Sequence, residues 1–251
     1  MLYLYGIAAG DRERRLGEVK GIGRPARPVF SVPTAPWSLI VSTVDRSDLL
    51  TPDDAVAHSR VLEHVNRTET VIPVRLGTVA GSEEELKAVV ATHQEALAAL
   101  MHRVNGRVEV GIKVYWNDEL LQETLARHID LGGVRAESAR DPARAYHIAL
   151  EVGQLAEQIT NDWREQIIRK ITERLRPKAD DMTIGKLSSI YMLCNVSFLI
   201  ERQQAESFGA AVDQLSKDLN EKFRLHYVED LPPFSFANLA LGGPGDGGVL
   251  A

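Results

Sequence analysis

The segment Val108–Tyr115 alternates apolar residues with polar or small ones over eight positions, and this pattern constrains the fold more than any other feature of the chain. Because successive side chains of a strand point to opposite faces, the aliphatic residues share one face, whereas Glu109, Lys113 and Tyr115 share the other. Such a strand is typical of a sheet with one face against a hydrophobic layer. The chain must therefore supply further strands and the helices that cover them.

The residues before this strand predict those partners. We expect strands at 2–8, 29–32, 37–44 and 70–79. Thr51 before Pro52, and Ser82 before Glu85, are typical helix N-termini. The second of these helices is expected to run on to Asn105-Gly106. Residues 11–28 are basic and rich in Gly and Pro, and we interpret them as a solvated loop.

This order of elements favours an α+β fold with two domains. Residues 1–116 match a ferredoxin-like βαββαβ domain, an antiparallel sheet with helices on one face. Residues 117–236 predict a related α+β layer that contains one long helix at 142–176, which Pro177 ends. Residues 237–251 are rich in Gly, and we expect them to form a flexible tail.

Composition excludes several classes of function. The chain has 251 residues, with 29 basic and 35 acidic side chains and a net charge of −6, which argues against nucleic-acid binding. Its one cysteine, Cys194, rules out a disulfide framework and a multi-thiolate zinc site. The seven histidines form no HxxxH pair, so we expect no metal and no cofactor.

The start of the chain and its apolar stretches bear on localisation. The first residues have no basic region before them, and no stretch reaches the roughly 20 apolar residues that a spanning helix needs. We therefore expect a cytoplasmic protein with no membrane association.

Four residues are candidates for chemistry: His58, Arg75, Glu109 and Lys113. His58 lies on the apolar side of its helix, where a satisfied core histidine is more common than a ligand. Arg75 and Glu109 lie on different strands, and we hypothesise that they form a buried salt bridge that holds register rather than performing catalysis. A pocket gathering His58 with a carboxylate would instead favour an enzyme or a small-molecule-binding protein.

The segment Pro232-Pro233-Phe234-Ser235-Phe236 is distinct from the rest of the chain. Its prolines preset an extended backbone, and its two phenylalanines need a groove. That groove lies either on the segment's own domain or on a partner protein.

Several of these segments together carry a family resemblance. They are Tyr3–Ile7, Val61–Glu63 after His58, the run Val71–Val79, the strand that begins at Gly106, and the terminal Pro232–Phe236. In this order they cover almost the whole chain, and the Pro-Val-Arg-Leu-Gly-Thr-Val run is the most specific. The chain resembles the GvpF/GvpL family of gas vesicle proteins.

The resemblance implies an accessory or minor structural protein of the gas vesicle, built from two α+β domains. It implies binding to the small hydrophobic shell protein GvpA, a role in vesicle assembly and buoyancy, and no enzymatic activity, with no small-molecule ligand. The motif positions are then structural or partner-binding candidates: Pro73, Arg75, Gly77, Glu109, Lys113, Pro232, Pro233, Phe234 and Phe236. The alternative that stays open is a ferredoxin-like small-molecule-binding protein or enzyme with a pocket around His58, Arg75 and Glu109.

Overall fold

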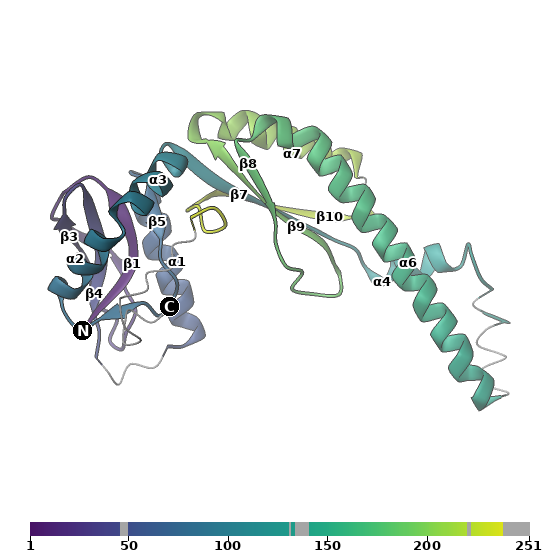
Figure 1. Ribbon diagram of the computed structural model, residues 1–251. Helices are drawn as coiled ribbons and strands as arrows, with labels where there is room; N and C mark the ends of the chain where they lie inside the picture. The colour runs from purple at the N-terminus through teal and green to yellow at the C-terminus, as the bar shows by residue number, and fades with distance from the viewer. Residues whose placement is uncertain (46–49, 131, 134–140, 220–221, 238–251) are drawn as a thin grey trace. The chain divides into compact units, whose positions relative to one another are not determined.

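The computed structural model describes residues 1–45, 50–130, 132–133, 141–219 and 222–237 (Figure 1). The chain divides into two compact units, called here unit 1 and unit 2. Unit 1 contains Met1–Val110, Leu199–Arg202 and Glu229–Ala251, and unit 2 contains Gly111–Phe198 and Gln203–Val228. This division groups the terminal segment with unit 1, whereas we expected it in the second domain. The tail expected at 237–251 lies outside the described residues except for Ala237.

Unit 1 begins with four strands and continues with helices and short strands. The bounds are β1 Leu2–Ala9, β2 Arg15–Lys20, β3 Pro28–Thr34, β4 Trp37–Thr43, α1 Pro52–Asn66, β5 Val71–Pro73, β6 Val79–Ala80, α2 Glu83–Thr92, α3 Gln94–Val104 and the start of β7 Arg107–Tyr115. The strand order is β2-β3-β4-β1-β5, with β6 also pairing with β1. Four strands come before the first helix, so the element order differs from the βαββαβ order that we expected.

Strand β1 lies inside this sheet between β4 and β5, and it runs antiparallel to both. Tyr3 pairs with Ser42 of β4, and Gly6 pairs with Pro73 of β5. The expected loop at 11–28 contains β2, which pairs antiparallel with β3. Because β2 is an edge strand with mostly exposed side chains, its sequence lacks the apolar alternation that identifies a half-buried strand.

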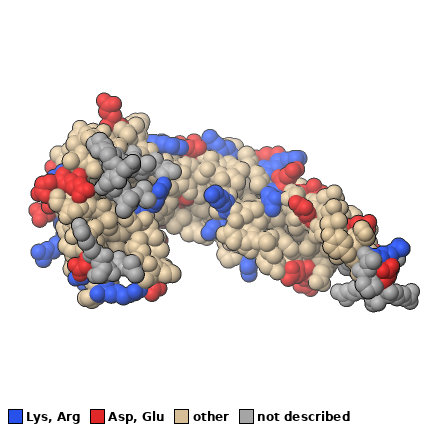
Figure 2. All heavy atoms as spheres, turned by 60° about the horizontal axis from the view of Figure 1, so that its bottom comes forward, with Lys and Arg blue, Asp and Glu red and all other residues tan. Residues whose placement is uncertain are grey.

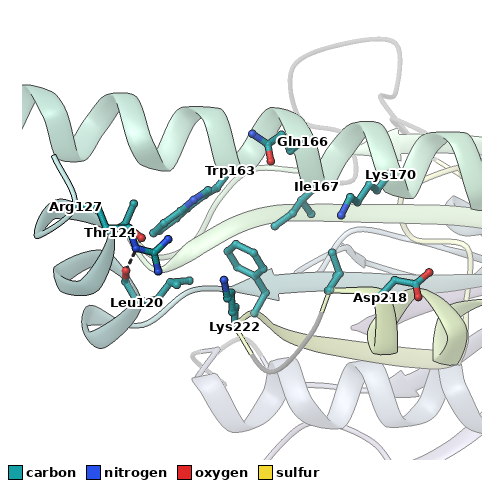
Figure 3. Close-up of a pocket in the computed structure, with 11 residues that line it drawn as sticks. Leu120, Thr124, Arg127, Trp163, Gln166, Ile167, Lys170, Asp218 and Lys222 are labelled. Carbon is teal, nitrogen blue, oxygen red and sulfur yellow. Dashed lines mark hydrogen bonds between the residues drawn. The ribbon is translucent and has the colours of Figure 1, made fainter.

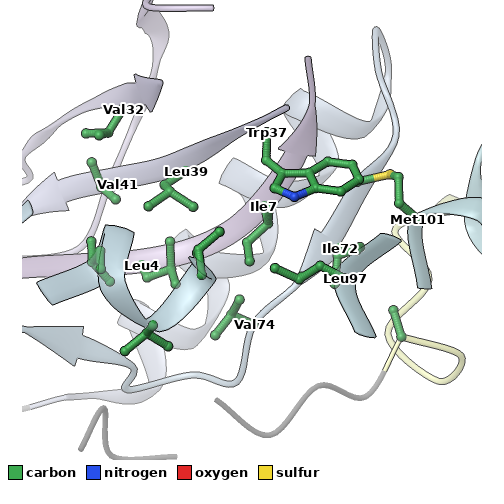
Figure 4. Close-up of a cluster of buried hydrophobic side chains, with 14 of the residues drawn as sticks. Leu4, Ile7, Val32, Trp37, Leu39, Val41, Ile72, Val74, Leu97 and Met101 are labelled. Atoms are coloured by element: carbon green, nitrogen blue, oxygen red, sulfur yellow. The ribbon is translucent and has the colours of Figure 1, made fainter. Parts of the chain in front are cut away.

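Helices cover both faces of this sheet, which corrects the expectation of helices on one face (Figure 1). Tyr3 and Tyr5 of β1 pack in one cluster with Val61 and Leu62 of α1. The opposite face packs against α2 and α3, and Figure 4 shows its side chains, with Met101 of α3 beside the Trp37 ring. Strands β1 and β4 are therefore buried on both faces.

The helix expected from 83 to 104 is two helices, α2 and α3, which meet at His93. The carbonyl of Val89 accepts a hydrogen bond from the Thr92 hydroxyl at 2.8 Å, and the His93 ring nitrogen Nδ1 lies 2.8 Å from the same oxygen. The backbone N–H of His93 bonds to Val90 instead. These side chains replace the backbone bond of a continuous helix and so end α2.

Unit 2 holds the long helix and most of a four-stranded sheet. The bounds are α4 Asp118–Leu125, α6 Pro142–Leu175, η1 Arg176–Lys178, β8 Asp181–Ile184, β9 Met192–Glu201, η2 Arg202–Gln204, α7 Ala205–Asp218 and β10 Arg224–Leu231. The sheet order is β10-β7-β9-β8, and the boundaries between the units fall inside β7, β9 and β10.

Helix α7 packs on the sheet of unit 2 through Phe208, whose ring centroid lies 5.3 Å from that of Phe198 on β9. Helix α6 buries Ile167, Ile171 and Leu175 of the predicted stripe. It ends at Leu175, where the 3₁₀ turn that contains Pro177 begins. Within the described residues, no helix combines the length and hydropathy that a membrane crossing requires.

Candidate functional site

The family-motif run at 71–79 forms β5, a turn and β6. Pro73 is buried and pairs with Gly6. The carbonyl of Arg75 accepts hydrogen bonds from the N–H of Thr78 at 3.3 Å and from its hydroxyl at 2.7 Å. Gly77 has a φ of 92°, a left-handed backbone conformation that residues other than glycine rarely adopt. The motif thus encodes a tight turn, and the Arg75 side chain is exposed.

The Gly77 turn is joined to a buried polar network around Tyr3. The Tyr3 hydroxyl accepts a hydrogen bond from the N–H of Gly77 at 3.1 Å and lies 2.8 Å from Nδ1 of His58. Burial raises the pKa of Tyr3 above its ordinary range and lowers the pKa of His58 to about 4. A hydrogen bond of His58 to the backbone of Val74 opposes that lowering.

These contacts determine the state of His58. The Tyr3 hydroxyl lies at hydrogen-bond distance from Nδ1, and the backbone of Val74 is the second hydrogen-bond partner of the ring. The ring is neutral, 4% exposed and satisfied at both nitrogens. His58 is therefore a core histidine, as we expected for its position on the helix.

Glu109 is buried, and the terminal segment satisfies its carboxylate. Oε2 accepts a hydrogen bond from the N–H of Ser235 at 2.7 Å, and Oε1 accepts one from the Ser235 hydroxyl at 2.7 Å. The salt bridge hypothesised between Arg75 and Glu109 is wrong, because Arg75 is exposed and Glu109, 3% exposed, binds Ser235 instead. The alternation of the strand identified the polar face but not the segment that covers it.

The terminal segment folds onto unit 1. The carbonyl of Pro233 accepts from the N–H groups of Phe236 and Ala237, which closes a turn. Phe236 is 4% exposed and belongs to the core cluster of the α2–α3 face, and Arg103 donates to its carbonyl at 3.3 Å. Pro232 is also buried. Of the two phenylalanines, only Phe234 remains exposed.

The other sequence candidates do not converge on one site. His58 packs with Tyr3 and Tyr5, Glu109 binds Ser235, and Arg75 is exposed, so the three residues of the expected pocket have separate surroundings. Lys113 is half-buried on β7. Cys194 is buried in β9, and burial raises its pKa to about 12, which leaves the thiol protonated and unreactive.

Sequence reasoning missed a pocket inside unit 2 (Figure 3). It measures about 230 Å³ and lies among α4, α6, the end of α7 and the start of β10. Its apolar lining comes from α4, from α6 and from the connection between α7 and β10: Leu120, Trp163, Ile167, Leu219 and Phe223. The Trp163 and Phe223 rings meet edge to face, with centroids 5.7 Å apart.

Charged side chains surround this apolar lining. Arg127, which follows α4, Lys170 of α6 and Lys222 are exposed and line the pocket, and none has an ion-pair partner among the described residues. The one acidic lining residue, Asp218, forms a salt bridge with Arg174. The signals that could have located the pocket are Trp163 within the helix stripe, Lys170 on the same helix, and the basic residues Arg127 and Lys222 after α4 and α7.

Over the described ranges, no group of three or more His, Cys, Asp or Glu side chains is placed to hold a metal ion. On the face seen in Figure 2, basic and acidic side chains are interspersed with neutral ones among the residues that the structure covers. A continuous basic surface, which nucleic-acid binding requires, is absent from that part of the described surface.

The fold matches crystal structures of gas vesicle proteins. The structure of GvpF from Microcystis aeruginosa superposes with a TM-score of 0.73 at 24% identity, covering 95% of this chain and 99% of that one. The structure of GvpF from Anabaena sp. PCC7120 gives a TM-score of 0.75 at 24% identity, covering 95% and 98%. The mixed α/β fold with antiparallel sheets is therefore that of gas vesicle proteins.

Sequence similarity assigns the family. Residues 1–238 match the family described as gas vesicle synthesis protein GvpL/GvpF, and the chain belongs to this family. Gas vesicle protein F of Streptomyces sp. (strain CB03234) is 28% identical over 237 residues, which are 93% of this chain and 98% of that protein. Gas vesicle protein L of the same strain is 25% identical over 200 residues, which are 75% of this chain and 70% of that protein.

Proposed function

We propose that this protein is an accessory or minor structural protein of the gas vesicle that binds the shell protein GvpA and supports vesicle assembly. The observation that carries the proposal is the family match over residues 1–238. The protein acts in the cytoplasm at the vesicle, and its role is association with other gas vesicle proteins rather than catalysis. The separate surroundings of His58, Arg75 and Glu109 support a role without catalysis at those residues.

The physical need for such a partner follows from the shell itself. A protein that forms a gas-tight wall exposes large apolar surface before assembly, and apolar patches of that kind aggregate. A folded partner that covers this surface until assembly would prevent the aggregation. The chain is 44% hydrophobic, so its contact with the shell protein has to come from a local surface.

One local surface of unit 2 has the required character. The connection from β8 to β9 exposes Ile184, Leu187 and Ile190, called here the 184–190 patch. Ile190 is 79% exposed, more than any other large hydrophobic side chain on the described surface. The patch adjoins β8, an edge strand of the four-stranded sheet, and an edge strand offers unpaired backbone groups to a partner strand.

The experiment is a pull-down of the shell protein with the full chain, combined with fractionation of purified vesicles. We expect capture of the shell protein and co-purification of the chain with vesicles. Ile190→Ser should weaken capture, whereas Val56→Ser, at an exposed position of α1, should leave it unchanged. Failure of the unaltered chain to capture the shell protein and to co-purify with vesicles would refute the proposal.

A further inference from the structure

We propose that the pocket of unit 2 binds an acidic segment of a partner protein that inserts one bulky apolar side chain beside the edge-to-face pair of Trp163 and Phe223. This inference rests on the proposed function, because it gives the chemistry of a partner segment in vesicle assembly. It concerns residues separate from the 184–190 patch.

The apolar lining favours a single inserted side chain. Leu120, Ile167 and Leu219 are at most 8% exposed, whereas the two aromatic rings are half-buried and open toward the surface. The volume of about 230 Å³ is below the roughly 300–1,000 Å³ of pockets that hold cofactors or drug-sized ligands. A side chain delivered by a protein segment fits such a pocket, and burial of its apolar surface supplies the favourable free energy.

The basic rim specifies the charge of the segment. Arg127 follows α4, Lys170 lies on α6 and Lys222 comes shortly before β10, and all three line the pocket, as the labels in Figure 3 show. This concentration of cations without partners among the described residues contrasts with the net charge of −6 for the whole chain. Carboxylates on either side of the inserted side chain would pair with these cations and steer the encounter.

The end of α7 distinguishes a peptide from a compact phosphate ligand. Helix α7 ends at Asp218, so its last carbonyls, with the negative end of the helix dipole, lie on the side of the pocket lined by Asp218 and Leu219. A multiply charged phosphate in the centre of the pocket would be repelled there. Single carboxylates spread along the rim avoid that repulsion and reach the exposed lysines.

The test uses the full chain and a fluorescein-labelled synthetic peptide with a central leucine flanked by glutamates. Fluorescence anisotropy measures binding to the unaltered chain and to the variant Lys170→Glu/Lys222→Glu. The matched control is Arg169→Glu/Lys178→Glu, which makes the same change of charge at exposed positions that do not line the pocket. Thermal melts of all three proteins verify that each is folded.

We expect the peptide to bind the unaltered chain and the control alike, and to bind the Lys170→Glu/Lys222→Glu variant about tenfold more weakly or worse. Added salt should weaken binding, and a peptide with serine in place of the leucine should bind less well. No binding to the unaltered chain, or equal losses in both variants, would overturn the inference. So would displacement of the peptide by inorganic phosphate or a short oligonucleotide at equal concentration.

A parallel pull-down of the shell protein separates this inference from the proposed function. Capture of the shell protein that persists in Lys170→Glu/Lys222→Glu, with loss of peptide binding in that variant, would leave the function standing and would support the pocket as the site of a partner segment other than the shell protein. Peptide binding without any capture of the shell protein would support the chemistry of the pocket and refute the proposed function.

Discussion

Replacing Glu109 tests whether the terminal segment is held to unit 1 by one buried carboxylate. Glu109→Ala removes both acceptors of Ser235, and each hydrogen bond to a charged group contributes about 1.5–3 kcal/mol. Ser235 is exposed, so water regains part of that energy at its two donors. We therefore expect a loss of about 2–3 kcal/mol of unfolding free energy.

Two further variants measure how much each of the two hydrogen bonds between Glu109 and Ser235 contributes to the unfolding free energy. In Glu109→Gln one amide oxygen still accepts from the Ser235 N–H, and the amide NH₂ donates to the Ser235 hydroxyl, so the expected loss is about 1 kcal/mol. Ser235→Ala removes only the hydroxyl bond, and we expect about 1 kcal/mol here as well. The double variant Glu109→Ala/Ser235→Ala should be less destabilised than the sum, by about 1 kcal/mol, because the two residues share that bond.

The assay is urea unfolding of the full chain together with amide hydrogen exchange of residues 234–237. The turn closed on the Pro233 carbonyl should lose protection in Glu109→Ala and keep most of it in Glu109→Gln. Unchanged exchange at Ser235, with an unfolding midpoint equal to that of the unaltered chain, would refute the reasoning. Strictly additive losses in the double variant would show that the two side chains do not interact.

Three further predictions concern His58, Gly77 and Phe236 of unit 1. The pKa of His58 is lowered from 6.5 to about 4, so between these pH values the unfolded chain binds more protons than the folded chain. The unfolding free energy should therefore fall by about 3 kcal/mol as the pH drops from 6.5 to 4. Urea unfolding midpoints measured against pH should show this fall, and the variant His58→Gln should show a smaller one. Gly77→Ala should lower the unfolding free energy by about 1–2 kcal/mol, because residue 77 has a positive φ. Gly153→Ala should raise it by about 0.5–1 kcal/mol, because residue 153 lies in the middle of α6 with free space around a Cβ. The two variants should shift the melting temperature in opposite directions. Phe236→Ala should lower the unfolding free energy by about 3–5 kcal/mol, because it leaves a cavity in the core. Phe234→Ala, at an exposed site, should lower it by less than about 1 kcal/mol. Equal decreases of the melting temperature in the two variants would contradict the observed burial.

Several elements could be predicted from local sequence. The alternation at 108–115 predicted β7, and Thr51 with Pro52 predicted the start of α1. The apolar stripe and Pro177 predicted the long helix α6 to within a residue of its end. These features depend on neighbours within a few positions, since strand alternation, helix periodicity and capping are local properties of the backbone.

Other features could not be predicted because they depend on distant residues. Ser235 lies 126 residues beyond Glu109, and nothing in the strand itself indicates that a proline-rich segment will cover its polar face. Strand β2 has exposed side chains and is held by its backbone pairing with β3, so its side-chain pattern carried no signal. The break at His93 depends on two side chains that compete for one carbonyl.

By itself, the sequence determined the α+β character of the chain, the strand β7, the start of α1, the long helix α6 and the resemblance to a family that the comparisons confirm. Only the tertiary structure decided that Glu109 binds Ser235, that His58 is a neutral core residue, and that Arg127, Lys170 and Lys222 surround one apolar pocket. The physical reason is that hydrogen-bond partners, desolvation and convergent charge arise from packing between segments far apart in the chain. The periodicity of a local segment does not predict those contacts.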